Sequence, residues 1–141
     1  MQILSKKVYI APSVFFAFID RAHPKYQTAG AFFRYFALEQ YALYSDAISI
    51  NQAYDDIYRR ISPSLAKDFL RSLSIGSFNI LYPDQSDTKA ALKTLVNYRT
   101  TDLTYSDAII AVMANRNRIT QVCSFEYLHP LFGLSLFYLP I

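Results

Sequence analysis

The side chains in this sequence best suited to chemistry are two carboxylates at the expected ends of secondary-structure elements. Asp107 stands just before the apolar run AIIAVM, where a helix is expected, and Glu126 follows the apolar run ITQVC, where a strand is expected. Oxygen ligands of this kind suit hard divalent cations such as Mg²⁺. A carboxylate in the first turn of a helix is also stabilised by the helix dipole. Asp107 therefore has two interpretations, a metal ligand in a cleft or an ordinary helix-start carboxylate.

Other carboxylates lie within reach of these two in the sequence. Asp55 and Asp56 fall within one expected helix, and Asp102 lies in the loop before the helix that Asp107 opens. Their alternative interpretation is as exposed charges of a helix and a loop. We interpret Asp20 and Asp46 as ordinary surface charges.

The remaining reactive side chains form no pattern. His23 and His129 could act as acid and base in metal-free RNA cleavage, but nothing in the sequence brings them together. Cys123, the only cysteine, lies in an apolar run and is interpreted as an inert core thiol. A single cysteine also excludes an internal disulfide and a cysteine-ligated metal cluster.

The elements that must position these side chains alternate along the chain. Apolar β-branched and aromatic runs predict strands, and apolar residues at helical spacing predict helices. The strands are expected at 8–10, 43–45, 78–82, 119–125 and 134–139, and the helices at 13–20, 23–43, 46–61, 62–75, 83–99 and 104–117. This order predicts an α/β fold with a parallel central sheet of about four to five strands and helices on both faces. In such sheets, ligands gather at the carboxyl ends of the strands.

Local signals mark several helix starts. Ser13 is the expected N-cap of the first helix, and Ser62, followed by Pro63, that of the fourth. Asp84 and Asp87 open the fifth helix, where a negative charge suits the helix dipole.

The composition indicates one well-packed domain. Of 141 residues, 52% are hydrophobic and 18% charged, which is enough apolar surface for a core. The 12 Tyr and 11 Phe predict an aromatic core or an aromatic interface. Because one helix can hardly bury every ring on one face, some rings in the segment FFRYF (32–36) are expected to be exposed. The net charge of +3 comes from scattered residues and does not by itself argue for nucleic acid.

Hydropathy gives no sign of a membrane protein. No uninterrupted apolar run reaches the length of about 18 residues that a membrane span needs, and no signal peptide is recognisable. We therefore expect no membrane association and a cytoplasmic location.

Four segments taken together resemble PIN domains, in particular the VapC-type ribonuclease toxins of bacterial toxin–antitoxin pairs. They are VYIAPSVFFAFID, LYSDAISINQAYDDI, LTYSDAIIAVMA and ITQVCSFEYLHPLFGLSLF. They are similar to the family's opening strand and helix, its second strand with an acidic helix, its Asp-Ala helix start and its closing strand. The resemblance covers essentially the whole chain and implies one PIN-like domain over residues 1–141.

This resemblance implies a chemistry and a set of partners. In the family, three or four carboxylates hold Mg²⁺ or Mn²⁺, which ready a water for attack on RNA and stabilise the leaving oxygen. Family members commonly form homodimers and bind an antitoxin protein through their helices. RNA, an antitoxin-like protein and a second copy of the chain are therefore the expected partners.

The family's acidic positions are only half retained here. They match Ala11, Gln52, Asp107 and Glu126, so that two acids supply a charge of −2 where four would supply −4. A methyl group cannot bind a metal, and a carboxamide offers one neutral oxygen. Pro12 also removes a backbone donor beside the site. These departures from the family pattern imply that Mg²⁺ or Mn²⁺ is bound weakly or not at all.

The neighbourhood of these positions could compensate in part. Ser13 and Ser124 match small hydroxyl positions that line the site in the family. Asp55, Asp56 and Asp102 are the carboxylates that could supply the missing charge from nearby turns.

Three functions remain open. The first is a degenerate PIN domain that has lost or weakened its nuclease activity and acts by binding RNA or protein. The second is an active metal-dependent endoribonuclease toxin that uses Asp107, Glu126 and a rescuing carboxylate, or an inactivated variant of such a toxin; the native codon at position 11 would distinguish the last case. The third is a protein-interaction module that uses exposed rings.

Overall fold

The centre of the molecule is a parallel sheet, which the sequence predicted. The structure is a computed structural model that describes residues 6–98, 102–126 and 133–140. Its five described strands lie in the order β3-β2-β1-β4-β5, and every neighbouring pair is parallel. They are β1 (Lys7–Ile10), β2 (Ala42–Asp46), β3 (Phe78–Leu81), β4 (Gln121–Cys123) and β5 (Ser135–Leu136). The carboxyl ends of β1, β2 and β4 therefore meet at one edge of the sheet.

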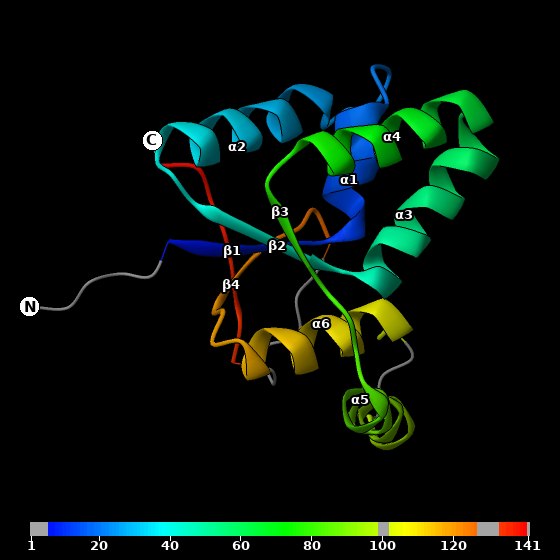
Figure 1. The fold of residues 1–141 in the computed structure, drawn as a ribbon, viewed down its shortest axis with the longest axis vertical. Coiled ribbons are helices and arrows are strands. Elements are labelled where there is room, and N and C mark those ends of the chain that lie inside the picture. Colours follow the sequence, from blue (N-terminus) through cyan, green and yellow to red (C-terminus); the bar gives the residue numbers. More distant parts are fainter. Residues whose placement is uncertain (1–5, 99–101, 127–132, 141) are drawn as a thin grey trace, which may run out of the picture.

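Helices cover both faces of this sheet (Figure 1). On one face lie α1 (Pro12–Ile19), α2 (Tyr26–Leu38), α3 (Ala47–Arg60) and α4 (Pro63–Ile75). On the other lie α5 (Gln85–Asn97) and α6 (Tyr105–Arg116). The α/β fold with two covered faces is confirmed. None of the helices that the structure describes is both long and apolar enough to cross a membrane.

Each face has its own apolar core because side chains alternate along a strand. Val8 and Ile10 of β1 belong to the core beneath α1–α4, whereas Tyr9 belongs to the core beneath α5 and α6. All three are fully buried. β1 is therefore the central support of the molecule, and the residue that follows it is held in a fixed place.

The rings of α2 are packed inward, so the expectation of exposed rings at 32–36 is wrong. Phe32 and Phe36 are buried, and Phe33 and Tyr35 are half-buried. The helix does not bury these rings alone. Phe137, which follows β5, contacts three of them, and Tyr41, Phe78 and Phe125 close the remaining sides. Segments distant in sequence thus supply the aromatic partners that one helix lacks.

Three predicted helix boundaries can be compared with the structure. The prediction for Ser13 is wrong, because α1 begins at Pro12 with Ala11 as its N-cap. Ser62 is confirmed as the N-cap of α4, where its hydroxyl accepts a hydrogen bond from Leu65 N. The second helix is shorter than predicted: it ends at Leu38, and Gln40 turns the chain toward β2 with a φ of 58°.

Candidate functional site

A cleft of about 400 Å³ lies at the carboxyl edge of the sheet. Its walls come from α1, the turn before α2, one face of α3 and the segment after β4. The lining residues are Pro12, Ser13, Phe16, His23, Pro24, Lys25, Gln52, Asp56, Arg60, Phe125 and Glu126. Of the four positions that match the family's acids, this cleft contains Gln52 and Glu126.

Ala11 occupies the end of β1 and points into the core. It is 5% exposed, and its methyl group packs in the apolar cluster that contains Ala108 and Ile109 of α6. Its backbone N–H donates to the carbonyl of Cys123, which joins the ends of β1 and β4. The position at the centre of the sheet edge is therefore closed by an apolar side chain.

Gln52 reaches across from α3 to the first turn of α6. Its Oε1 accepts a hydrogen bond of 2.5 Å from Oγ of Ser106. The carboxamide oxygen, which is the only atom of this side chain that could bind a cation, thus already has a donor. The amide nitrogen, a donor itself, is the end left for the cleft.

Asp107 serves first as a helix cap. Its Oδ2 accepts from the backbone N–H of Thr104, and its own N–H donates to Oγ1 of Thr104, so the two residues form a capping box at the start of α6. The structure thereby supports the helix-start interpretation of Asp107. Asp107 is only half-buried and does not line the cleft.

Glu126 lies in a field of like charge. Burial of its carboxyl raises the pKa, and the negative charges of Asp107 and Asp56 raise it further. Asp107 and Asp56 are therefore both near enough to Glu126 to disfavour its ionised form.

Two hydroxyls, those of Ser13 and Ser124, link α1 to the segment that follows β4. Oγ of Ser13 accepts from the backbone N–H of Phe125 at 3.0 Å and lies 3.3 Å from Oγ of Ser124. Oγ of Ser124 accepts in turn from the N–H of Glu126. These bonds fix the turn after β4 against α1, which explains why small hydroxyl side chains suit both positions.

The structure separates the three carboxylates that could supply missing charge. Asp56 lines the cleft, one helical turn from Gln52. Asp55 is half-buried on α3 outside the lining, and Asp102 is exposed before α6. His23 lines the cleft, whereas His129 lies outside the described residues.

Asp46 is not the surface charge that the sequence suggested. It is fully buried and caps α3, where Oδ1 accepts from Ser49 N and Oδ2 from the hydroxyls of Ser49 and Tyr9. Burial raises its pKa, while the hydrogen bonds from Tyr9 and Ser49 act in the opposite direction. An aspartate directly before an amphipathic helical run was an available sign of this cap.

The donors present do not fit the metal centre that the family resemblance implies. Ala11 offers no ligand, and Gln52 has its oxygen engaged by Ser106. Within residues 6–98, 102–126 and 133–140, no three His, Cys, Asp or Glu side chains converge closely enough to hold a metal ion. Ala11 and Gln52 therefore do not supply the two carboxylates that the family pattern places at these positions.

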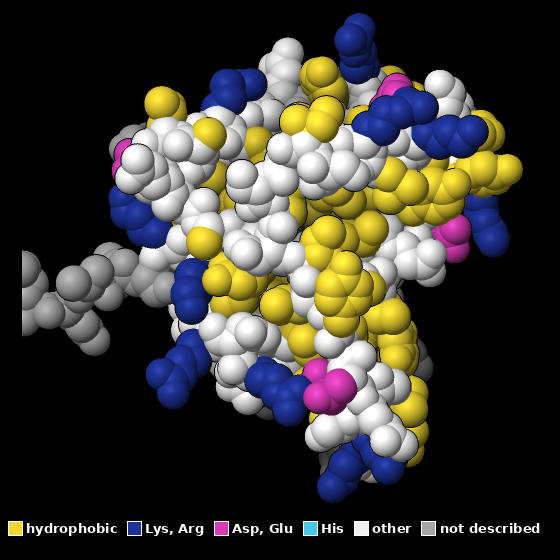
Figure 2. All heavy atoms as spheres, viewed as in Figure 1, with side chains coloured by type: hydrophobic (Ala, Val, Ile, Leu, Met, Phe, Trp, Pro, Cys, Tyr) yellow, Lys and Arg dark blue, Asp and Glu magenta, His cyan; other side chains and the backbone are white. Residues whose placement is uncertain are grey.

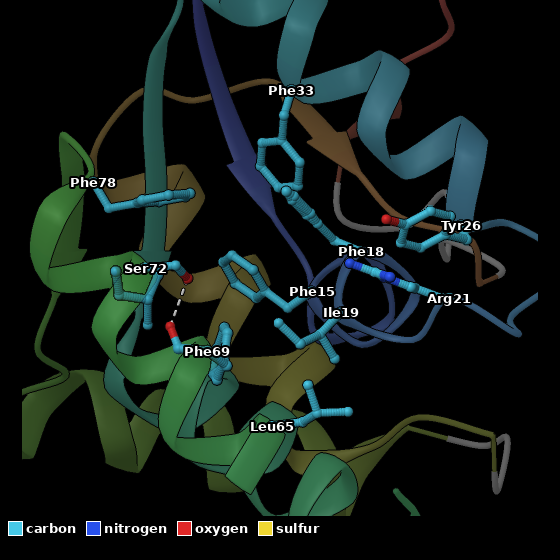
Figure 3. Close-up of a pocket in the computed structure, with 11 residues that line it drawn as sticks. Phe15, Phe18, Ile19, Arg21, Tyr26, Phe33, Leu65, Phe69, Ser72 and Phe78 are labelled. Carbon is cyan, nitrogen blue, oxygen red and sulfur yellow. Dashed lines mark hydrogen bonds between the residues drawn. The ribbon is translucent and has the colours of Figure 1, made fainter.

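A second hollow, of about 430 Å³, lies on the other side of α1 (Figure 3). Its walls are mostly apolar side chains of α1, α2, α4 and β3. They are Phe15, Phe18, Ile19, Phe33, Leu65, Phe69, Leu73 and Phe78. Arg21 and Tyr26 lie together at one end, and Oγ of Ser72, which also lines the hollow, donates to the backbone carbonyl of Phe69 within α4. The hollow is therefore an apolar groove with one basic end.

Comparison with known proteins gives a match in fold alone. No protein-family model matches the chain, and no curated protein matches it. Among solved structures, the crystal structure of Mycobacterium tuberculosis VapC20, described as a sarcin-ricin loop cleaving toxin, superposes with a TM-score of 0.76 at 14% identity. The match covers 89% of this chain and 92% of that one. The chain therefore has the PIN-like fold of VapC toxins, and the predicted fold is confirmed.

Proposed function

We propose that this chain is a VapC-like protein whose metal-dependent nuclease activity is lost or strongly weakened, and that it acts by binding RNA. We further propose that residues 1–141 form a single PIN-like domain and that the protein is located in the cytoplasm. The observation that carries the proposal is the presence of Ala11 and Gln52 at two positions where the family pattern has acids. Ala11 turns a methyl group into the core, and Gln52 has its oxygen held by Ser106. The loss of two ligands removes several kcal/mol of transition-state stabilisation, or about a hundredfold or more in rate.

Cleavage of RNA by the purified protein tests this proposal. The sarcin–ricin loop is the first substrate to try, because VapC20 is described as cleaving it. In Mg²⁺ or Mn²⁺ we expect no cleavage by the protein as it is and metal-dependent cleavage by the Ala11→Asp/Gln52→Glu variant. EDTA, which removes the metal ion, is the control for both proteins. Because Ala11 lies in a core, thermal unfolding must show that the variant folds, and Gln52→Glu alone is the second variant if it does not.

Residual activity is the second candidate, and the position of Asp56 favours it. Asp56 lines the same cleft as Glu126 and, with Asp107, contributes to the raised pKa of Glu126. If the unchanged protein cuts RNA at a rate close to that of the restored variant, and both Asp107→Asn and Asp56→Asn abolish the cutting, the main proposal is wrong. Asp56 would then be the rescuing carboxylate, because Asp55 and Asp102 do not line the cleft.

An antitoxin-like protein partner is a further proposal, supported by the apolar groove in Figure 3. Phe18 is 42% exposed at its rim, and Arg21 at one end favours an acidic residue beside the apolar segment of the partner. A photo-crosslinking residue at position 18 should capture one defined partner peptide, whereas the same residue at position 67, on the exposed side of α4, should not. Equal capture at both positions would contradict a specific groove.

Homodimer formation is proposed through the β3 edge of the sheet. Figure 2 shows apolar side chains gathered over the region that β3 and α4 occupy in Figure 1. A shallow hollow of about 300 Å³ there is lined by Leu70, Ile80 and Tyr82, and Tyr82 is 73% exposed. Sedimentation velocity should give a dimer for the unchanged protein and a monomer for Tyr82→Asp. A monomer in both cases would exclude this interface.

A further inference from the structure

The side chains of α3 that line the cleft at the sheet edge differ in charge along the helix. Gln52, Asp56 and Arg60 are spaced four residues apart and all line the cleft, so they form one stripe on the helix. The stripe is roughly 12 Å long, from the rise of a helix over eight residues. Gln52 stands at the end near α6, and Arg60 stands at the end near α1 and the turn before α2. The two ends therefore offer different chemistry to a bound chain.

At the basic end of the stripe, the side chain of Arg60 is held by an aromatic contact. The guanidinium carbon of Arg60 lies 4.8 Å from the centre of the Phe16 ring. The other neighbour of this ring is His23, whose imidazole meets it edge-on at 5.8 Å. Stacking on an aromatic face restrains an arginine but leaves the N–H groups at the edge of its plane free to donate. Arg60 is thus restrained at the cleft without its donors being consumed.

Lys25 stands beside this stack. Its backbone N–H donates to Nδ1 of His23 at 3.0 Å, which fixes the turn that carries both residues. Among the described residues, neither Nζ of Lys25 nor the guanidinium of Arg60 has an ion-pair partner, in contrast to Lys6, Arg71 and Arg116. Two cations with unused donors therefore line one cavity.

The opposite end also presents a donor. Because Oε1 of Gln52 accepts from Ser106, its amide N–H groups are what it can offer to a ligand in the cleft. A glutamate at this position would present negative charge and call for a cation. The glutamine instead suits an anionic oxygen.

We propose that the cleft binds the backbone of single-stranded RNA without a metal ion: Arg60 and Lys25 hold one phosphate, and the amide of Gln52 donates to a phosphate oxygen at the other end. This proposal rests on the proposed function and specifies the ligand and its contacts. Pro12, Phe16 and Phe125 form an apolar wall for the ribose or base of an unstacked nucleotide. The volume of about 400 Å³ suits a nucleotide-sized ligand. Asp56, in the middle of the stripe, and Glu126, elsewhere on the cleft wall, both repel phosphate, which leaves the two ends of the stripe as the points of contact.

Fluorescence anisotropy with a short labelled single-stranded RNA in EDTA tests the proposal. Arg60→Ala and Lys25→Ala should each weaken binding about tenfold, the size expected for one charge-assisted hydrogen bond. Each should also reduce the slope of log affinity against log salt by about 0.7. Arg59→Ala is the matched control, because Arg59 is the neighbouring exposed cation of α3 and does not line the cleft. It should bind within about twofold of the unchanged protein.

Gln52→Glu tests the other end of the stripe. In EDTA it should weaken binding about tenfold, because a carboxylate repels the phosphate that the amide attracts. If Gln52→Glu binds the RNA as well as the unchanged protein, the contact from this end is wrong. Thermal unfolding of each variant shows that any loss does not come from misfolding.

The outcomes separate this proposal from the one on which it rests. If the unchanged protein does not bind RNA at all, the proposed RNA-binding function itself fails. If it binds but Arg60→Ala and Lys25→Ala behave like Arg59→Ala, the RNA lies elsewhere and only the cleft proposal fails. Equal or tighter binding of duplex RNA, or of single-stranded DNA of the same sequence, or a requirement for Mg²⁺, would likewise overturn the metal-free single-stranded RNA site.

Discussion

The hydroxyl of Tyr9 donates a hydrogen bond of 2.5 Å to Oδ2 of Asp46, and both side chains are fully buried. The bond joins the central strand β1 to the start of α3, the helix that carries Gln52, Asp56 and Arg60 to the cleft. The same carboxylate also accepts from the backbone and hydroxyl of Ser49. Burial of this acid is tolerated because three hydrogen bonds, from Tyr9 and Ser49, replace those that water would supply.

Tyr9→Phe should destabilise the protein by about 1–3 kcal/mol, because a buried carboxylate loses one of its donors. The pKa of Asp46 is higher in the folded protein than its value of 3.8 in the unfolded chain. The stability that Asp46 contributes is therefore complete at a pH below 3.8, and it is lost as the pH rises through the folded pKa. Removing Tyr9 removes a bond that lowers this pKa, so the cost should be larger at about pH 8 than at about pH 4. Urea unfolding at both pH values measures it. Tyr58→Phe, at a half-exposed ring of α3, is the control, and an equal loss in both variants would argue against the Asp46 contact.

Arg116→Met should cost about 1–2 kcal/mol. Arg116 of α6 pairs with Asp84 and Asp87 at the start of α5, and the side chain of Asp87 is only 5% exposed. The variant leaves that buried carboxylate without its counter-charge, although the capping box with Asp84 remains. Arg71→Met is the matched comparison, because its pair with Asp68 is exposed and should contribute less than about 0.5 kcal/mol. Chemical denaturation compares the two, and an equal effect would contradict a special role for Asp87.

Glu126→Gln should stabilise the protein slightly at neutral pH. Burial and the charges of Asp107 and Asp56 raise the folded pKa of Glu126 above its unfolded value of 4.5. The glutamate therefore favours the folded state only at low pH, and that contribution disappears as pH rises through the folded pKa. The gain should stay below about 1 kcal/mol because solvent screens an exposed group, and it should vanish by about pH 4. A gain in thermal stability that does not change between about pH 4 and pH 7 would refute the charge explanation.

Cys123 should resist alkylation while the protein is folded. Burial raises the pKa of its thiol to about 12, so almost no thiolate exists at neutral pH, and the side chain is shielded from reagents. Iodoacetamide should label it at a rate that follows the unfolded fraction across a urea titration. Rapid labelling without urea would show that the end of β4 opens independently of the rest of the sheet.

Much of this architecture could be predicted from local sequence. The order of strands and helices follows from apolar periodicity, and the caps at Ser62 and at Asp84 with Asp87 follow from residue types at fixed offsets. The parallel sheet follows from the alternation of those elements. The inert character of Cys123 likewise follows from the apolar run around it. Each of these features depends on neighbours within one or two turns, which the linear sequence contains.

The candidate site depended on contacts between distant segments, and there the sequence misled in two places. The sequence suggested that Asp46 is a surface charge, but in the structure it is buried and accepts a hydrogen bond from Tyr9 of another strand. The hydroxyl of Ser13 looked like a helix cap but is bound to the turn after β4. Local propensity assigns such polar residues to the surface or to the nearest helix end because it contains no information on distant donors.

The sequence by itself determined that Ala11 and Gln52 replace acids of the family pattern, since this requires only residue identity. Only the tertiary structure decided what those substitutes do. Ala11 packs in the core beneath α6, and the oxygen of Gln52 accepts a hydrogen bond from Ser106. Asp56 lines the cleft, whereas Asp55 does not. The tertiary structure also placed Lys25, just before α2, and Arg60, at the end of α3, on the walls of the same cleft. The physical reason is that charge and hydrogen bonding act over a few ångströms in space, whereas groups that meet at this cleft can be far apart along the chain, as Ser13 and Phe125 are.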